Sequence, residues 1–199
     1  MNNKFLKKIL GIFGYKLIEK QVIKNNRLLS KDSFLTTERI LNRLFEKNLI
    51  NSLIQIGAND GIRFDSLNHF IKKYKTKSLL VEPITSNFEK LKNNYTNCEH
   101  ITFENSAISV NNEIAYLFKV NPIYIKDYGH HIPGITSFQK KHLIKHGVKR
   151  SHIIKEKVNT TNIITLINKH NFNKLSLLFI DAEGYDGKIV IDFFKNCPL

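Results

Sequence analysis

The sequence LIQIGANDG at residues 53–61 predicts a short buried strand that runs directly into a tight glycine turn. A helix is predicted over residues 64–74, because its apolar side chains recur at helical spacing. A strand, a glycine-rich turn and a helix in this order form the first half of a nucleotide-binding βαβ unit. In such a unit the glycines let backbone N–H groups approach a ligand, and the helix N-terminus favours negative charge.

A second apolar run, LLVEP at residues 79–83, strengthens this interpretation. It ends in Glu82, which lies about 20 residues beyond the glycine turn. Nucleotide-binding folds place a carboxylate at this position to accept hydrogen bonds from the ribose hydroxyls. We therefore expect Glu82 to bind a ribose.

The rest of the chain continues the alternation of strands and helices. Further strands are predicted at residues 101–104, 114–120, 153–158 and 175–180, and further helices after residue 85, at 162–170 and after 186. Such an alternation is typical of an α/β fold with a mostly parallel sheet covered on both faces. The core strands would end at Gly57, Glu82, Asn105 and Asp181, at the edge where open α/β sheets bind ligands.

The composition restricts the class of protein. The chain has 199 residues, a net charge of +14 and 42% hydrophobic residues, which suits one soluble globular domain. The positive charge first suggests a nucleic-acid partner, but the lysines are spread along the chain and no RNP-like, zinc-finger or basic-zipper pattern occurs. We therefore expect no nucleic acid among the partners.

Cysteine content and hydropathy indicate the compartment. Cys98 and Cys197 are the only cysteines, which is too few for a disulfide framework or a metal-type cysteine cluster. No apolar run approaches the roughly 20 residues that a membrane span needs. The sequence favours the reducing cytoplasm.

The N-terminal segment differs from the rest of the chain. Residues 1–20 mix lysines with apolar side chains, which fits a basic amphipathic helix on the inner face of an anionic membrane or, alternatively, a helix docked on the domain. We expect residues 1–50 to form a helical extension and residues 51–199 to form the main domain.

Residues 121–150 interrupt the regular pattern. They contain two prolines, three glycines and four histidines, and they show little periodicity. A segment of this length is predicted to be a functional lid or a disordered loop. Its histidines include candidates for a general base, because histidine titrates near neutral pH; they are His130 and His131.

Five segments together resemble the FkbM-type S-adenosylmethionine-dependent methyltransferases. They are IQIGANDG (54–61), LLVEP (79–83), ENSAIS (104–109), the region from Ser137 to Gly147, and LLFIDAEGYD (177–186). The resemblance implies a Rossmann-like class I methyltransferase fold, a three-layer sandwich. It also implies methyl transfer from S-adenosylmethionine, usually to a hydroxyl oxygen of a sugar, a glycolipid or a secondary metabolite.

The resemblance also implies roles for individual residues. Glu82 would hold the ribose hydroxyls, and Asp181 would face the sulfonium and the methyl acceptor. The turn under the methionine part of the cofactor would comprise Gln55, Gly57, Asn59, Asp60 and Gly61. The residues against the adenine would be Asn105, Ser106 and Ala107.

Catalysis would fall to a group that takes the proton of the acceptor hydroxyl. The candidates are Asp181, Glu183 beside it, and His131. Carboxylates at Asp181 and Glu183 would also suit Mg²⁺, but nothing in the sequence requires a metal ion, and the histidines lack zinc-ligand spacing.

The family resemblance predicts three further strands after the fourth core strand and its helix, but the sequence stops at Leu199. Residues 175–180 would then form an edge strand that a second copy of the chain could pair with. A naturally short chain, a paired edge and a fragment all remain open explanations. Two alternative functions also remain: a binding module that has lost catalysis, and an NAD-dependent dehydrogenase, although the third glycine of GxGxxG is missing.

Overall fold

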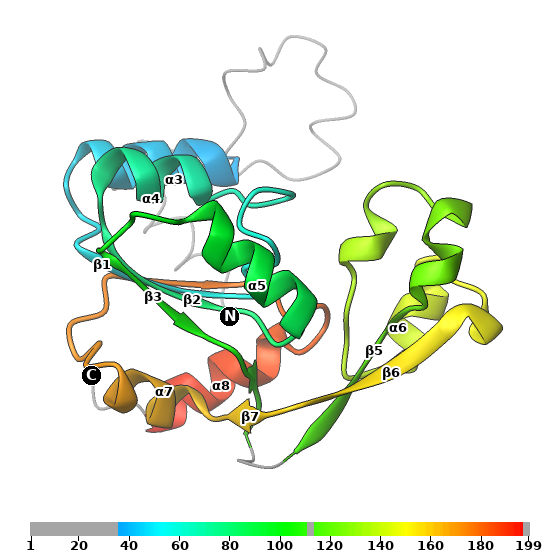
Figure 1. Cartoon of the computed structure of the whole chain (residues 1–199). Coiled ribbons are helices and arrows are strands. Elements are labelled where there is room, and N and C mark those ends of the chain that lie inside the picture. Colours follow the sequence, from blue (N-terminus) through cyan, green and yellow to red (C-terminus); the bar gives the residue numbers. More distant parts are fainter. Residues whose placement is uncertain (1–35, 111–113, 197–199) are drawn as a thin grey trace, which may run out of the picture. The chain divides into compact units, whose positions relative to one another are not determined.

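The computed structural model of the chain describes residues 36–110 and 114–196 (Figure 1). The chain divides into two units, residues 1–43 and 44–199. Helix α3 (Thr37–Glu46) spans the boundary between them, whereas the sheet and the candidate site lie in the second unit. The predicted amphipathic helix over residues 1–20 falls outside the described residues. No helix in the described ranges is long and apolar enough to cross a membrane.

Four parallel strands form the central sheet of the second unit. The order across the sheet is β3 (Ile101–Glu104), β2 (Lys77–Val81), β1 (Ser52–Ile56) and β8 (Leu177–Ile180). The last residue of β1, Ile56, lies opposite Val81 of β2 and Ile180 of β8. These strands therefore end in register, and the chain leaves all of them at the same edge. The predicted α/β class and mostly parallel sheet are confirmed.

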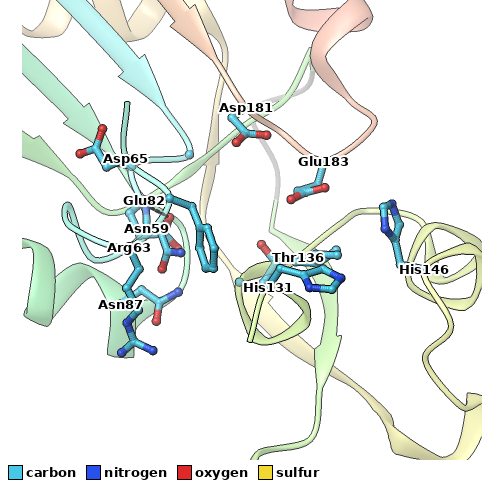
Figure 2. A pocket seen from close by; sticks show the side chains of 15 residues that line it. Asn59, Arg63, Asp65, Glu82, Asn87, His131, Thr136, His146, Asp181 and Glu183 are labelled. Atoms are coloured by element: carbon cyan, nitrogen blue, oxygen red, sulfur yellow. Dashed lines mark hydrogen bonds between the residues drawn. The ribbon is translucent and has the colours of Figure 1, made fainter. Parts of the chain in front are cut away.

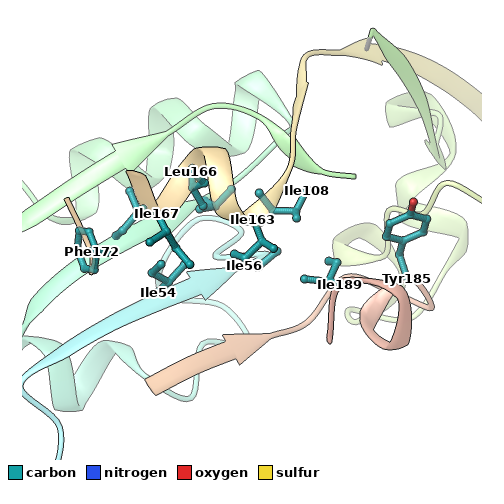
Figure 3. Close-up of a cluster of buried hydrophobic side chains, with 11 residues drawn as sticks. Ile54, Ile56, Ile108, Ile163, Leu166, Ile167, Phe172, Tyr185 and Ile189 are labelled. Carbon is teal, nitrogen blue, oxygen red and sulfur yellow. The ribbon is translucent and has the colours of Figure 1, made fainter. Parts of the chain in front are cut away.

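Helices cover both faces of this sheet (Figure 1). One face carries α4 (Asn68–Tyr74) and α5 (Thr85–Asn94), and the other carries α7 (Ile163–Lys169) and α8 (Asp186–Asn196). Figure 3 shows Ile54 and Ile56 of β1 packed with Ile163 of α7 and Ile189 of α8. Because β1 and β2 are covered on both sides, every residue of β1 and all but the first residue of β2 are buried, and most of them are apolar.

Strand β8 lies at an edge of the four-stranded sheet. The sequence predicts a strand over residues 175–180, and all four residues of β8 are only half-buried. The reason is that β8 has a strand neighbour on one side only, namely β1, within the described part of the chain.

An ordered insertion replaces the irregular segment that the sequence predicts at residues 121–150. It joins the antiparallel strands β5 (Ala115–Val120) and β6 (Ile153–Val158), while the short strands β4 (Ala107–Ile108) and β7 (Thr160–Thr161) pair nearby. The insertion contains η2 (Pro122–Asp127), η3 (Ile132–Gly134), α6 (Lys140–Lys145) and η4 (Arg150–His152). It has a hydrophobic cluster of its own, comprising Val120, Ile132, Ile135, Leu143, Val148 and Ile153.

Candidate functional site

The glycine turn after β1 is packed tightly against its neighbours. Gly57 has φ +82°, and a Cβ atom added there would lie 2.0 Å from the carbonyl oxygen of Asp181. Gly61 has φ +73°, and a Cβ atom there would lie 2.6 Å from side-chain atoms of both Leu91 and Tyr95. Both positions therefore require glycine for steric as well as conformational reasons. The turn is held directly beside the end of β8.

Glu82, which follows β2, is a buried carboxylate with its oxygens aimed at the turn. Its side chain is 4% exposed. Oε2 accepts the backbone N–H of Asn59 and Oε1 accepts that of Ile84, both at 2.9 Å. Burial raises the pKa of Glu82 to about 7, although these bonds and one from the Asn87 side chain lower it. A carboxylate has about four lone-pair sites, so with these three donors Glu82 keeps capacity for one further donor.

A hydrogen-bonded loop after β8 presents Asp181 and Glu183. The Asp186 carboxylate fixes this loop by accepting the backbone N–H groups of Ala182 at 2.8 Å and Gly184 at 3.0 Å. Glu183 has φ +46°, which is uncommon for a residue other than glycine. The loop therefore holds Glu183 in a conformation that an isolated chain would disfavour.

The insertion holds the same loop from the other side. The Ser137 hydroxyl donates to the Glu183 carbonyl oxygen at 2.7 Å, and His142 Nε2 lies 3.0 Å from Glu183 Oε2. The carboxylate of Asp181 has no such partner among the described residues and remains exposed. Desolvation raises its pKa, and the negative charges of Glu183 and Asp186 raise it further. Asp181 is thus a stronger base than an ordinary aspartate.

One cavity of about 250 Å³ collects these groups at the carboxyl edge of the sheet (Figure 2). Figure 2 shows Asp181 and Glu183 on one side of it, Glu82 and Asn59 on another, and His131 and Thr136 of the insertion facing them. Its lining thus includes several predicted site residues: Gly57, Asn59, Glu82, His131, Asp181 and Glu183.

A second, smaller cavity of about 40 Å³ adjoins the first, with which it shares Glu82 and Asp181. Ser106 and Ala107, the predicted adenine contacts, line this smaller cavity. Asn105 lies beside it in the chain, and its side-chain amide donates to the carbonyl oxygens of Glu82 at 2.8 Å and Pro83 at 3.3 Å. Asn105 therefore fixes the backbone around Glu82.

Three of the predicted turn residues do not line the first cavity: Gly61, Gln55 and Asp60. Gln55 is buried inside the sheet layer, where its amide nitrogen donates to Asp65 Oδ1 at 2.9 Å, and Asp65 in turn lines the cavity. Asp60 is also buried; it accepts the backbone N–H groups of Ile62 and Arg63 and pairs with the Arg63 guanidinium at 2.9 Å. Both side chains brace the loop between β1 and α4.

The histidines of the insertion are divided between cavities. His131 lines the first cavity, whereas His130 is exposed and stacks on the ring of Phe64 at 5.9 Å between centroids. In the part of the chain that the structure describes, no group of three or more His, Cys, Asp or Glu side chains is placed to hold a metal ion.

The sequence-based prediction missed several residues that shape the site. Arg63, Asn87 and Thr136 line the cavity, and His142 holds Glu183. Asn87 lies in the first turn of α5, directly after the LLVEP strand. Because that strand is predicted to bind a ligand, the sequence could have indicated that Asn87 lines the site. Thr136 and His142 belong to the insertion, where no periodicity predicts which side chains face the sheet.

Comparison with known proteins assigns the family. A family model described as the methyltransferase FkbM domain matches residues 55–197, which includes the glycine turn, Glu82, the insertion and the loop after β8. No curated protein and no solved structure matches the chain. Since the matched region covers well over half of the sequence, the chain belongs to the FkbM methyltransferase domain family.

Proposed function

We propose that the protein uses S-adenosylmethionine to methylate a hydroxyl oxygen of a sugar, a glycolipid or a secondary metabolite. The observation that carries this proposal is the arrangement of Glu82, Asp181 and Glu183, which reach one cavity from the ends of two strands beside the glycine turn. The family assignment supports methyl transfer. The cofactor is our inference from the chemistry of the lining, and the class of acceptor is what the resemblance to the family implies.

The lining residues fit S-adenosylmethionine better than a dinucleotide. Among the described residues that line the cavity, four are carboxylates and only Arg63 is permanently cationic. A cationic sulfonium favours such a lining, whereas the pyrophosphate of NAD would be repelled by it. Glu82 would hold the ribose hydroxyls, because a carboxylate forms charge-assisted hydrogen bonds with paired hydroxyls. Asn59 and Gly57 would lie beside the methionine part.

The reaction requires an acceptor oxygen to be held in line with the methyl group and to lose its proton. When bound, S-adenosylmethionine supplies a methyl group activated by the sulfonium. A carboxylate of the lining would accept the proton that the acceptor hydroxyl loses on methylation. Asp181 suits this role because its raised pKa makes it a stronger base than an ordinary aspartate. Holding the two reactants in position supplies much of the remaining acceleration.

Glu183 and His131 are the alternative groups for this proton. Glu183 is restrained by Ser137 and His142, so its carboxylate is well positioned but already engaged by one hydrogen bond. His131 faces the cavity from the insertion (Figure 2). Asp181 is preferred because no described residue donates a hydrogen bond to its carboxylate, which leaves both oxygens accessible to an acceptor.

Calorimetric titration tests the cofactor. S-adenosylmethionine and NAD are titrated into the wild type, Glu82→Gln and Glu99→Gln, the last of which makes the same change at an exposed side chain. We expect S-adenosylmethionine to bind the wild type and Glu99→Gln equally and Glu82→Gln at least tenfold more weakly, because a charge-assisted hydrogen bond to the ribose is lost. Tighter binding of NAD, or equal binding to all three proteins, would refute the proposal.

A further inference from the structure

A third cavity lies next to the site and has a different chemical character. It is a groove of about 670 Å³ between the start of α5 and the insertion. The groove and the first cavity adjoin, since they share six lining residues: Asn59, Arg63, Phe64, Asn87, Gly134 and Thr136. A molecule lying in the groove could therefore extend one end toward Asp181 and Glu183.

Phe64 marks the boundary between the groove and the first cavity. The sequence predicts that Phe64 begins a helix, but it has φ +60°, and α4 starts only at Asn68. A positive φ is a rare conformation for a bulky residue, and strain of this kind clusters at functional sites. The phenyl side chain is 56% exposed, so it presents an aromatic face to both cavities.

Cationic side chains reach the groove from three separate segments. Among its described lining residues, Arg63, Lys90 and Lys119 are permanently cationic, and Asp60 is the only carboxylate. Asp60 already accepts three hydrogen bonds, one from the Arg63 guanidinium and two from backbone N–H groups, so it offers little to a further cation. The groove thus carries an excess of positive charge.

These cations retain capacity for a ligand. Arg63 pairs with Asp60 through Nε, which leaves its terminal nitrogens without a hydrogen-bond partner among the described residues. Lys90 is exposed and forms no ion pair with any described residue, whereas Lys119 pairs with Glu156, which does not line the groove. The first turn of α5, where Asn87 lies, adds the positive end of a helix dipole.

We propose that this groove binds a phosphate group carried by the methyl acceptor, and this inference rests on the proposed methyltransferase function. Cations that line one groove from three segments suit a tetrahedral dianion with three free oxygens better than a planar carboxylate with two. The hydroxylated part of the acceptor would lie against Phe64 and present its oxygen near Asp181. The acceptor class is therefore a phosphorylated sugar or polyol.

A titration with simple probes tests the phosphate site without knowledge of the natural acceptor. Glucose 6-phosphate, glucose and glucuronate are titrated into the wild type, Lys90→Gln and Lys92→Gln. Lys92 is the matched control: it lies on the same helix and is exposed, but it does not line the groove and pairs with Glu89.

We expect glucose 6-phosphate to bind the wild type more tightly than glucose or glucuronate. Its affinity should fall roughly three- to tenfold in Lys90→Gln, the range for losing one partly exposed charged contact, and stay unchanged in Lys92→Gln. Equal losses in both variants would show attraction to the net positive charge only. Equal binding of glucose, tighter binding of glucuronate, or no binding of the phosphate would also overturn the proposal.

The same samples separate this inference from the proposed function. S-adenosylmethionine should bind the wild type and Lys90→Gln equally, because Lys90 does not line the first cavity. A parallel loss of S-adenosylmethionine binding in Lys90→Gln would assign the groove to the cofactor and overturn the inference. If S-adenosylmethionine fails to bind the wild type while the phosphate probe behaves as expected, the proposed function fails and the anion site stands.

Discussion

Replacing Glu82 with glutamine should change how the stability of the protein depends on pH. Glu82 is 4% exposed, and burial raises its pKa from 4.5 to about 7. Below pH 4.5 the carboxyl group is protonated in both the folded and the unfolded chain. As the pH rises from 4.5 through 7, the unfolded chain loses this proton first, and the folded protein therefore loses stability.

The size of the effect follows from the two pKa values. Each pH unit between them corresponds to about 1.4 kcal/mol, so the contribution of Glu82 falls by about 3 kcal/mol between pH 4.5 and pH 8. Glutamine does not ionise and lacks this dependence. Its amide nitrogen cannot accept the N–H of Asn59 or Ile84, so Glu82→Gln should be the less stable protein at pH 4.5. The difference in free energy of unfolding between the wild type and Glu82→Gln should become smaller or change sign by pH 8.

Urea unfolding at pH 4.5 to 8 measures the free energy of unfolding of both proteins. The quantity of interest is the difference between the wild type and Glu82→Gln, because other titrating groups then cancel. Glu99→Gln serves as the control, and its difference from the wild type should stay constant. If the free energies of unfolding of the wild type and Glu82→Gln changed in parallel with pH, Glu82 would not titrate from a buried position, and its raised pKa would be refuted.

Three further predictions concern the turn, the proton and the base. Gly57→Ala should destabilise the fold by about 3 kcal/mol or more in thermal unfolding, since the added methyl meets the Asp181 carbonyl oxygen; Gly187→Ala, in open space within α8, should instead stabilise it by up to about 1 kcal/mol. Binding of S-adenosylmethionine at pH 7 should release protons, because hydroxyl donors favour the charged form of Glu82; titrations in buffers of different ionisation enthalpy that show no release would contradict this. Asp181→Asn should lower turnover about a hundredfold or more once an acceptor is identified, and full turnover would remove Asp181 as the base.

The parallel core was predictable because strands that are buried on both faces are mostly apolar, and this pattern is visible in the sequence. The strands at LIQI and LLV are buried and mostly apolar, and they are followed by Gly57 and Glu82, which the fold brings to one edge of the sheet. The positions of Glu82 and Asp181 follow from this register alone. Local rules thus suffice where a strand is central and its connection is short.

The insertion was not predictable because its order comes from tertiary packing. Its helical segments are three to six residues long, too short for periodicity to reveal. They are held by a small cluster around Leu143 and by side-chain bonds such as that between Tyr128 and His152 at 2.8 Å. Which of its histidines face the sheet depends on this packing, so His142 could not be distinguished from His130 in the sequence.

Carboxylate side chains bind backbone N–H groups just before α4 and α5. At α5, the N–H of Ile84, which occupies the cap position, donates to the Glu82 carboxylate. For α4, Asp65 accepts the backbone N–H of Leu67 at 2.8 Å, which ends the turn region before the helix begins. In both cases a carboxylate that lines the first cavity binds the N–H of the residue at the cap position.

A crystal structure of the protein with S-adenosylmethionine would show directly whether the cofactor binds in the first cavity. We expect the ribose hydroxyls to bind the Glu82 carboxylate and the sulfonium to lie in the cavity bounded by Asp181 and Glu183. The adenine should then lie in the adjoining cavity, beside Ser106 and Ala107. A cofactor bound elsewhere, or bound here with its ribose away from Glu82, would contradict the proposed binding site and the proposed role of Glu82.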